Sequence, residues 1–469
     1  MMKVLVFLDH DILVRHFVYS GVLDDMIKNH DVIFVFPEGN ASRISLKINS
    51  REHNAPCRRV SINPIRRRIW SWWFHADQMR WRPGSDYKFL RRFRRQSHSL
   101  KENIFLTILG LPLIFQLFVL ISHRQLKQHP AEALEELIDE EHPDILLHPT
   151  VLYGLFVNDL ITVGKQKNIP VVMQMNSWDN PSTKRSMIGN PDWLLVWGDQ
   201  SKQHAIQYAN MPESRAIKFG AAQFEVYRAP PRIDHLEFCR NHDIDPTKLI
   251  LLYAGSSKGT DEFAHLQRLE TAIDNGEIDN IAILYRPHPW GGAGKQGDRI
   301  IDYPWRHVRL ERSMLGYLQT VKSGTHTISI PDYKDTRDVL RNVDAMLSPV
   351  STILLEAAIL GCPVMCFLPN DEKHEAAHYA MTASLVHLLD LYYMPGIIIA
   401  ENGEQLICKT NELLACVGDA NVSQTLQKGA HYFVEPFEAP YGERLTSFLE
   451  SVCESHSEAA TVPFHNKAS

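Results

Sequence analysis

Short, continuously apolar runs alternate with helix-like stretches along this chain, and this alternation constrains its fold more than any other feature. Lys3–Leu8 and Val32–Phe36 are two such runs, with an expected helix from Ile12 to Lys28 between them. Strand, helix and strand in this order predict a parallel sheet. Further runs of the kind seen in strands covered on both faces are Asp144–His148, Pro170–Gln174 and Trp193–Trp197.

The same alternation restarts in the second half of the chain. It comprises expected strands at Leu249–Ala254, Ile281–Tyr285, Ala345–Leu347 and Val364–Phe367, and an expected helix at Asp261–Asn275. We therefore expect an α/β fold with two Rossmann-like domains that face a central cleft.

The expected domain boundaries follow from changes in composition. The first domain covers residues 1–220 and carries a basic, aromatic insertion at 64–122; the proline-rich and charged residues 221–248 form a linker. The second domain covers 249–435, and a closing helix at 436–453 packs back on the first. The small polar residues 454–469 are expected to be a disordered tail.

Charge and cysteine content exclude several classes of protein. The chain has 469 residues and a formal net charge of -6, which argues against a dedicated nucleic-acid-binding protein. Its 7 cysteines are scattered and form no CxxC pair, so neither a disulfide framework nor a zinc site is indicated. A reducing cytoplasm is the expected compartment.

The insertion suggests contact with a membrane surface. Pro64–Arg95 holds ten Lys or Arg residues against two Asp, interleaved with aromatic side chains. Such a composition favours an anionic membrane, although a solvated helical face packed on the first sheet is the alternative. The residues expected to face the membrane are Arg66, Arg67, Trp72, Trp73, Arg91 and Arg92. The apolar stretch Phe105–Ile121 is slightly short for a span, so a buried or interfacial helix is expected, with a spanning or re-entrant segment as the alternative.

The segment Leu347–Val364 is the most informative for chemistry. A strand ends at Ser348, and Ser351 or Thr352 is placed to cap a helix that stops at Gly361. Hydroxyls and free N–H groups at such a point suit a phosphate. Glu356 lies among apolar residues and needs water or a hydroxyl partner. The alternative is that Glu356 marks a solvent face and Ser351 is an ordinary cap.

Two further loops follow expected strands. Arg286 and His288 lie in a loop where prolines on both sides of the histidine fix the backbone, at the strand end where α/β sheets bind ligands. Gly255, Ser256, Ser257 and Lys258 form a loop able to surround a pyrophosphate, but without a P-loop or dinucleotide fingerprint. For His288 the alternative is a histidine bonded to a nearby carbonyl. For the Gly255 loop the alternative is a loop that binds no ligand.

Taken in order, the motifs "AGSS", "RPHP" and "SPVSTILLEAAILGCPV" resemble the donor domain of GT-B glycosyltransferases. More narrowly, they resemble bacterial surface-polysaccharide transferases and CDP-glycerol glycerophosphotransferases. Met175–Arg185, Val196–Ala205 and Lys218–Tyr227 are similar to segments of uncharacterised members of that group. The resemblance extends from about Ile145 to Pro369 and is more specific for fold than for substrate.

The resemblance implies roles for individual residues. Glu356 would hold the donor ribose, Ser351 and Thr352 would contact phosphate, and His288 would contact the phosphate or leaving group. The loop at Gly255 and Ser256 would border the same cleft. The complete expected donor site is Gly255, Ser256, Ser257, Lys258, Arg286, His288, Ser348, Ser351, Thr352 and Glu356. An acidic triplet that accompanies the HP motif in families using CMP-sialic acid is missing, which disfavours that donor.

A transfer that inverts the sugar needs a base near the acceptor hydroxyl. Asp11, directly after the first strand, is the first candidate, with His10 beside it and Asp179 as the rival; each has helix capping as its alternative role. His288 is the third expected catalytic residue. The sequence has no DxD triplet, and the resemblance implies no metal cofactor.

These observations predict a glycosyltransferase that moves a sugar from a nucleotide-activated donor to a surface-glycan or lipid-linked acceptor. Its expected partners are that donor, that acceptor and an anionic membrane surface, with no nucleic acid, at the inner face of the cell membrane. The alternatives are a CDP-glycerol or CDP-ribitol phosphotransferase and an inactive glycan- or nucleotide-binding protein. A UDP-sugar 2-epimerase is less favoured, because it has no use for the basic, aromatic insertion.

Overall fold

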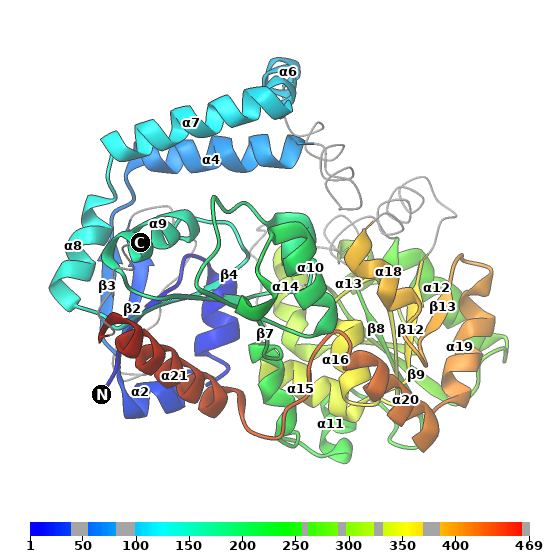
Figure 1. Cartoon of the computed structure of the whole chain (residues 1–469). Coiled ribbons are helices and arrows are strands. Elements are labelled where there is room, and N and C mark those ends of the chain that lie inside the picture. The colour runs from blue at the N-terminus through cyan, green and yellow to red at the C-terminus, as the bar shows by residue number, and fades with distance from the viewer. Residues whose placement is uncertain are drawn as a thin grey trace. The chain divides into compact units, whose positions relative to one another are not determined.

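The computed structural model describes residues 1–38, 55–80, 99–255, 261–288, 297–322, 332–368 and 385–461 (Figure 1). The chain divides into two compact units. Unit 1 comprises Met1–Glu225 and Val434–Ser469, and unit 2 comprises Val226–Phe433. Each unit is built on one parallel sheet, so the α/β class predicted from the sequence is confirmed.

The sheet of unit 1 has seven strands in the order β3-β2-β1-β4-β5-β6-β7. They are β1 (Lys3–Phe7), β2 (Asp31–Pro37), β3 (Cys57–Val60), β4 (Ile145–Thr150), β5 (Val171–Met175), β6 (Trp193–Val196) and β7 (Ala216–Lys218). The five expected strands are present. The sequence did not indicate β3 or β7, because β3 carries two arginines in four residues and β7 is only three residues long.

Helices cover this sheet and form its insertion. They are α1 (Asp11–Leu13), η1 (Val14–Val18), α2 (Asp24–Asn29), α4 (Pro64–Met79), α6 (Leu100–Leu109), α7 (Pro112–Gln128), α8 (Glu132–Glu141), α9 (Val157–Lys167), η3 (Asn180–Lys184), α10 (Asp199–Ala209), η4 (Glu213–Arg215) and α21 (Tyr441–Thr461). The expected continuous helix from Ile12 to Lys28 is wrong. Gly21 adopts a φ of 79°, and this turn separates η1 from α2.

The last helix returns to unit 1. Leu445, Leu449 and Val452 of α21 are buried in the core that also contains β1 and β2. The helix continues to Thr461, so residues 454–461 are helical rather than the expected disordered tail. Their Glu and Ala residues favour helix, and His456 Nε2 lies 2.9 Å from the carbonyl oxygen of Asn168. Residues 462–469 lie outside the described part.

The sheet of unit 2 has six strands in the order β10-β9-β8-β11-β12-β13. They are β8 (Leu249–Ala254), β9 (Ile281–Arg286), β10 (Val308–Leu310), β11 (Ala345–Pro349), β12 (Val364–Phe367) and β13 (Ile398–Ala400). In both units the second and third strands lie on one side of the first strand, and the later strands lie on its other side. This is the Rossmann strand order, with a switch point between β1 and β4 and another between β8 and β11.

The first helix of unit 2 lies within the segment that the sequence predicted to be a linker. The helices of this unit are α11 (His235–Asn241), α12 (Glu262–Asp274), α13 (Gly297–Asp302), α14 (Arg312–Lys322), α15 (Tyr333–Asn342), α16 (Ile353–Ile359), α18 (Val386–Tyr392), α19 (Gln405–Ala415) and α20 (Ala420–Ala430), with η5 (Ala222–Arg228) at the boundary. Residues 226–248, expected to be linker, belong to unit 2. Asp234 caps α11, and Phe238 and Cys239 are buried.

The insertion forms three packed helices, in which α7 runs alongside α4 (Figure 1). Two residues expected to face a membrane are instead buried: Arg66 pairs with Asp159, and Trp73 packs against Phe115. For these two the prediction is wrong, because α4 uses one face to pack. Arg67 is exposed and Trp72 is half-buried. Arg91 and Arg92 lie outside the described residues.

The apolar stretch of the insertion is not one helix. Within the described chain, no single helix is long and apolar enough to cross a membrane. Helices α6 and α7 meet such a test only together, and they are bent by 89°. The bend is at Gly110, where an added Cβ would lie 3.1 Å from the backbone of Met79. The expected buried or interfacial helix is therefore a bent pair, and much of its apolar surface is exposed.

Candidate functional site

The three motifs of the second half follow three neighbouring strands of unit 2. Gly255 follows β8, His288 follows β9, and Ser351 follows β11. Strand β8 pairs with both of the others, and all these pairs are parallel. The three loops therefore leave the same edge of the sheet, and those of β8 and β11 flank the switch point, where open α/β sheets bind ligands.

A buried carboxylate supports the glycine loop. The backbone N–H of Gly255 donates to the carbonyl of Arg286 over 2.8 Å. Both carboxylate oxygens of Glu262 lie 2.7 Å from where a Cβ on Gly255 would stand, so a side chain there would displace that carboxylate. Glu262 is fully buried and accepts a hydrogen bond from the hydroxyl of Tyr285. Sequence reasoning missed Glu262, since an acid at a helix start is ordinary; Ser256, Ser257 and Lys258 lie outside the described residues.

Arg286 ends β9 as a buried cation with an internal partner. Its Nη2 donates to Thr336 Oγ1 over 2.9 Å, and its Nη1 lies 3.6 Å from Glu311 Oε2. Burial alone would raise the pKa of Glu311, but Arg286, with hydrogen bonds from His242 and Ser313, brings that pKa to about 2. The guanidinium is thus fixed by a carboxylate that stays ionised. His288, two residues further on, is half-buried.

Glu356 has the hydroxyl partner that its apolar surroundings require. Its carboxylate is 8% exposed and accepts a hydrogen bond from the phenol of Tyr227. Burial, reinforced by this carboxylate, holds the pKa of Tyr227 well above its usual value. The phenol therefore stays protonated and donates, which fixes the position of the Glu356 carboxylate. The sequence analysis included Tyr227 at the end of the segment Lys218–Tyr227 but gave it no role.

The hydroxyls around the start of α16 differ in their surroundings. Ser348 is buried and donates to the carbonyl of Pro349 over 2.7 Å. Ser351 and Thr352 are half-buried, and Thr352 precedes the helix without a capping bond from its side chain. The expected cap is wrong for Thr352, because its φ and ψ of -60° and -27° are helical, unlike those of a capping residue. Gly361 ends the helix with a φ of 74°, as predicted.

The switch point of unit 1 holds an acid and a histidine that the sequence did not single out. Asp9 follows β1 and accepts a hydrogen bond from the backbone N–H of Leu155 over 3.0 Å. His148, in β4, is fully buried, with Nδ1 at 2.9 Å from the carbonyl of Phe7. Burial lowers the pKa of His148, partly offset by Asp9. Gly154 packs on the Asp9 carboxylate with no room for a side chain.

The acids proposed as catalytic base are placed differently. Asp11 is the first residue of α1, and its side chain lies outside what the structure describes. The Nδ1 atom of His10 accepts from the backbone N–H of Ile12. Asp179 accepts from Thr183 Oγ1 over 2.9 Å and pairs with Lys184 Nζ at 3.1 Å. The Asp179 carboxylate is therefore already bound by a hydroxyl and a cation of unit 1.

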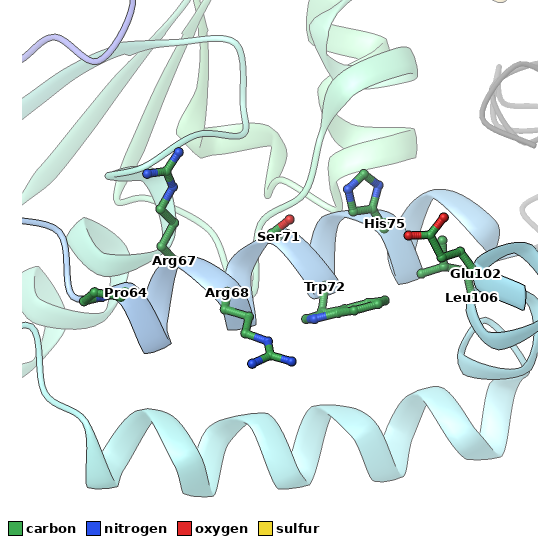
Figure 2. Close-up of a pocket in the computed structure, with 8 residues that line it drawn as sticks. All are labelled: Pro64, Arg67, Arg68, Ser71, Trp72, His75, Glu102 and Leu106. Carbon is green, nitrogen blue, oxygen red and sulfur yellow. The ribbon is translucent and has the colours of Figure 1, made fainter. Parts of the chain in front are cut away.

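A cavity of about 400 Å³ lies between α4 and α6 in unit 1. Figure 2 shows the residues that line it. Arg67 and His75 lie on one side of α4, whereas Arg68 and Trp72 lie on the other. The cavity belongs to the insertion, not to a strand end. Among the described residues, no group of three or more His, Cys, Asp or Glu side chains is arranged to hold a metal ion.

Comparison with solved structures identifies the fold. S. aureus MnaA, solved with UDP, is 11% identical with a TM-score of 0.52, and 97% of each chain is covered. A putative UDP-N-acetylglucosamine 2-epimerase from Listeria monocytogenes is 12% identical with a TM-score of 0.53, again over 97% of each chain. A glycosyltransferase from Rickettsia africae is 11% identical with a TM-score of 0.48, over 98% of this chain and 99% of that one.

No protein-family model matches the sequence, and no curated protein matches it. At these identities the first two structures establish the fold alone. The chain has the two-domain α/β architecture of the GT-B fold, as the sequence motifs predicted.

Proposed function

We propose that this chain is a glycosyltransferase that binds a nucleotide-activated sugar in unit 2 and transfers the sugar to a glycan or lipid-linked acceptor. The observation that carries the proposal is the position of the three motifs. The loops at Gly255, His288 and Ser351 follow adjacent parallel strands, with the switch point between two of them. A nucleotide donor needs phosphate and ribose contacts close together, and this sheet edge offers groups suited to both.

The residues take different parts in this donor site. The hydroxyls of Ser351 and Thr352 and the loop from Gly255 contact phosphate, while Glu356 accepts from the ribose hydroxyls. Tyr227 supports that role because its hydrogen bond orients the Glu356 carboxylate. Ser348 and Arg286 are buried and serve mainly to position the strand ends, since each already bonds within the protein.

His288 is the group that meets charge developing on the leaving phosphate. Donors that are already in position stabilise such charge without reorganisation. Asp11 remains the proposed base for the acceptor hydroxyl, ahead of Asp179, whose carboxylate already pairs with Lys184. Ser256, Ser257 and Lys258 complete the proposed phosphate loop.

Two other reactions are compatible with the same donor half. A UDP-sugar 2-epimerase is favoured by the name of the Listeria monocytogenes structure and by the UDP in the S. aureus MnaA structure. A CDP-glycerol or CDP-ribitol phosphotransferase is favoured by the order of the sequence motifs. The products separate the three: glycosyl transfer from a UDP-sugar releases UDP, transfer from a CDP-alcohol releases CMP, and an epimerase converts a UDP-sugar without any acceptor.

The first test is a thermal-shift screen of UDP-, GDP-, CMP- and CDP-linked compounds with the full chain. A ligand at 100 times its dissociation constant stabilises the folded state by about 2.7 kcal/mol. We expect one nucleotide class to raise the melting temperature, and the Glu356→Gln variant to lose most of that shift. Leu236→Gln, at an exposed position of unit 2, is the matched control. If none of these compounds stabilises the wild type, the proposal is overturned.

The second test concerns turnover by His288→Ala at saturating donor. A hydrogen bond to a charged group contributes roughly 1.5–3 kcal/mol, so turnover should fall at least about tenfold. Melting temperatures must match those of the wild type to exclude misfolding. Equal turnover would remove His288 from the chemistry. Epimer formed from a UDP-sugar without any acceptor would replace the transferase proposal by the epimerase.

A further inference from the structure

The bent helix pair α6–α7 exposes an unusual amount of aliphatic surface. Most of the large exposed apolar side chains in the described residues lie within this one segment. Within this segment the most exposed apolar side chains are Leu113, which is 80% exposed, and Leu100, which is 77% exposed. We call the exposed set the α6–α7 apolar face: Leu100, Ile104 and Ile108 on α6, and Leu113, Leu117 and Leu120 on α7. Exposed apolar side chains gathered on one segment in this way mark a docking surface.

This face is separate from the core of the insertion. Phe115 and Leu126 of α7 and Leu106 of α6 are buried, and Phe115 and Leu126 pack against Trp70 and Trp73 of α4. The apolar positions 113, 117 and 120 follow helical spacing on one side of α7, away from these contacts. Helix α7 is thus held to α4 by one side and presents a second apolar side to its surroundings.

Cations flank the apolar face. Arg124 and Lys127 follow Leu120 by four and seven residues, so they continue the same side of α7, and Lys101 lies in the first turn of α6. All three are exposed and form no salt bridge within the described residues. Long basic side chains beside an apolar stripe can bury their stems and reach phosphate groups. The pattern is that of a helix lying in the surface of an anionic bilayer.

We propose that the α6–α7 apolar face inserts into the surface of an anionic lipid bilayer, with α4 as the support that holds the pair to unit 1. The 89° bend, where Gly110 lies close to the backbone of Met79, suits two helices that lie in the surface better than one that crosses it. The membrane contact thus lies in α6 and α7, and not in the buried Arg66 and Trp73 of α4. This proposal does not depend on the chemistry of unit 2.

Charge favours lipid over a second copy of the chain as the occupant. A symmetric contact between two copies brings the same surface together, and the α6–α7 apolar face holds no acidic residue to meet Arg124 and Lys127 of the other copy. An anionic surface attracts these residues, although the whole chain carries a net charge of -6. The attraction is therefore local to the insertion and should weaken as salt increases.

The test is flotation of the full chain with vesicles of phosphatidylcholine alone and of equal parts phosphatidylcholine and phosphatidylglycerol. The variant Leu113→Gln, Leu117→Gln, Leu120→Gln should bind the anionic vesicles at least about tenfold more weakly than the wild type, since it removes three inserting side chains. The matched control is Leu236→Gln, Leu389→Gln, Tyr393→Gln, which removes exposed apolar side chains of unit 2 and should bind as the wild type.

A charge variant separates insertion from attraction. Arg124→Gln, Lys127→Gln should weaken binding to the anionic vesicles severalfold and remove part of its salt dependence. The proposal is overturned if the wild type floats with neither vesicle, or if the triple leucine variant binds as well as the wild type at an equal melting temperature. It is also overturned if light scattering shows a wild-type dimer that the triple variant dissociates without a change in vesicle binding, because a second copy then covers the face.

Discussion

The two units share a strand order but differ in what they bury at the carboxyl ends of their strands. Near this edge unit 2 buries Arg286, Glu311, Glu262 and Glu356, each with a charged or hydroxyl partner. In unit 1, strands β4 and β5 bury neutral groups, namely His148, Gln174 and, directly after β5, Asn176, whereas the buried carboxylate of Asp159 lies in the first turn of the helix that follows β4. Topology alone therefore fixes where a ligand can bind, whereas the buried side chains decide which charge it can carry.

Unit 1 also has a buried ion pair, and it joins two helices. Arg66 of α4 is 3% exposed, and its Nε donates to Asp159 Oδ1 of α9 over 2.9 Å. Its Nη1 donates to the carbonyls of Leu126 and His129. In unit 1 buried charge thus attaches the insertion, while in unit 2 it lies at the proposed site. The predictions below test this difference.

The largest effect is expected for Arg66→Met. Removing one partner leaves the Asp159 carboxylate buried without its cation, which typically costs about 3–5 kcal/mol. Amide hydrogen exchange should report faster exchange in α4 and α9 than in unit 2. Arg67→Met, one residue along on the exposed side, is the control and should change little. Equal exchange in both variants would mean that the ion pair does not hold the insertion.

A smaller loss is expected for Glu311→Gln in unit 2. The bond between a charged acceptor and its donors is worth about 1.5–3 kcal/mol. Since the pKa of Glu311 is about 2 in the folded state, below the usual 4.5, its contribution is complete above pH 4.5 and is lost as the pH falls toward 2. The free energy of unfolding should therefore fall less in the variant than in the wild type as the pH is lowered from 4.5 toward 2. An unchanged acid titration would contradict the role given to Arg286 as the partner of Glu311.

A still smaller loss is expected for Tyr227→Phe. The change removes the hydroxyl that satisfies the buried Glu356 carboxylate, at a cost of about 1–2 kcal/mol in the free energy of unfolding. If Glu356 also binds ribose, nucleotide affinity should fall in the same variant, as measured by calorimetry. Tyr393→Phe, at an exposed position of unit 2, controls for loss of a phenol. A stability loss with unchanged nucleotide affinity would leave Glu356 with a structural role only.

The smallest effect is a pH dependence of unit 1. Burial lowers the pKa of His148, while an unfolded histidine takes its proton near pH 6.5. Below that pH the unfolded state holds more protons, so the free energy of unfolding falls as the pH falls. Melting should drop by a few degrees between pH 7.5 and 5.5, and by less in His148→Gln. An identical drop in both proteins would assign the dependence to other groups.

The sequence by itself determined the inner strands of both sheets and the order of the loops at the proposed donor site, but not the edge strands β3, β7, β10 and β13. Continuous apolar runs indicate strands covered on both faces, and the alternation of strand and helix along the chain predicts a parallel sheet. Gly255 and Gly361 were recognisable because glycine suits the space or the φ that each position requires. The Ser351 and His288 loops could be assigned to one sheet edge because each directly follows a predicted strand of the same parallel sheet.

Only the tertiary structure decided which charged and apolar groups were buried. Tyr227 lies 129 residues from Glu356, and Asp159 lies 93 residues from Arg66, so no local pattern links either pair. The apolar sequence of α6 and α7 likewise fitted a core helix, a span or a surface helix. Periodicity describes one helix at a time, whereas exposure depends on which neighbours pack against it, and here α4 covers one side and leaves the other open.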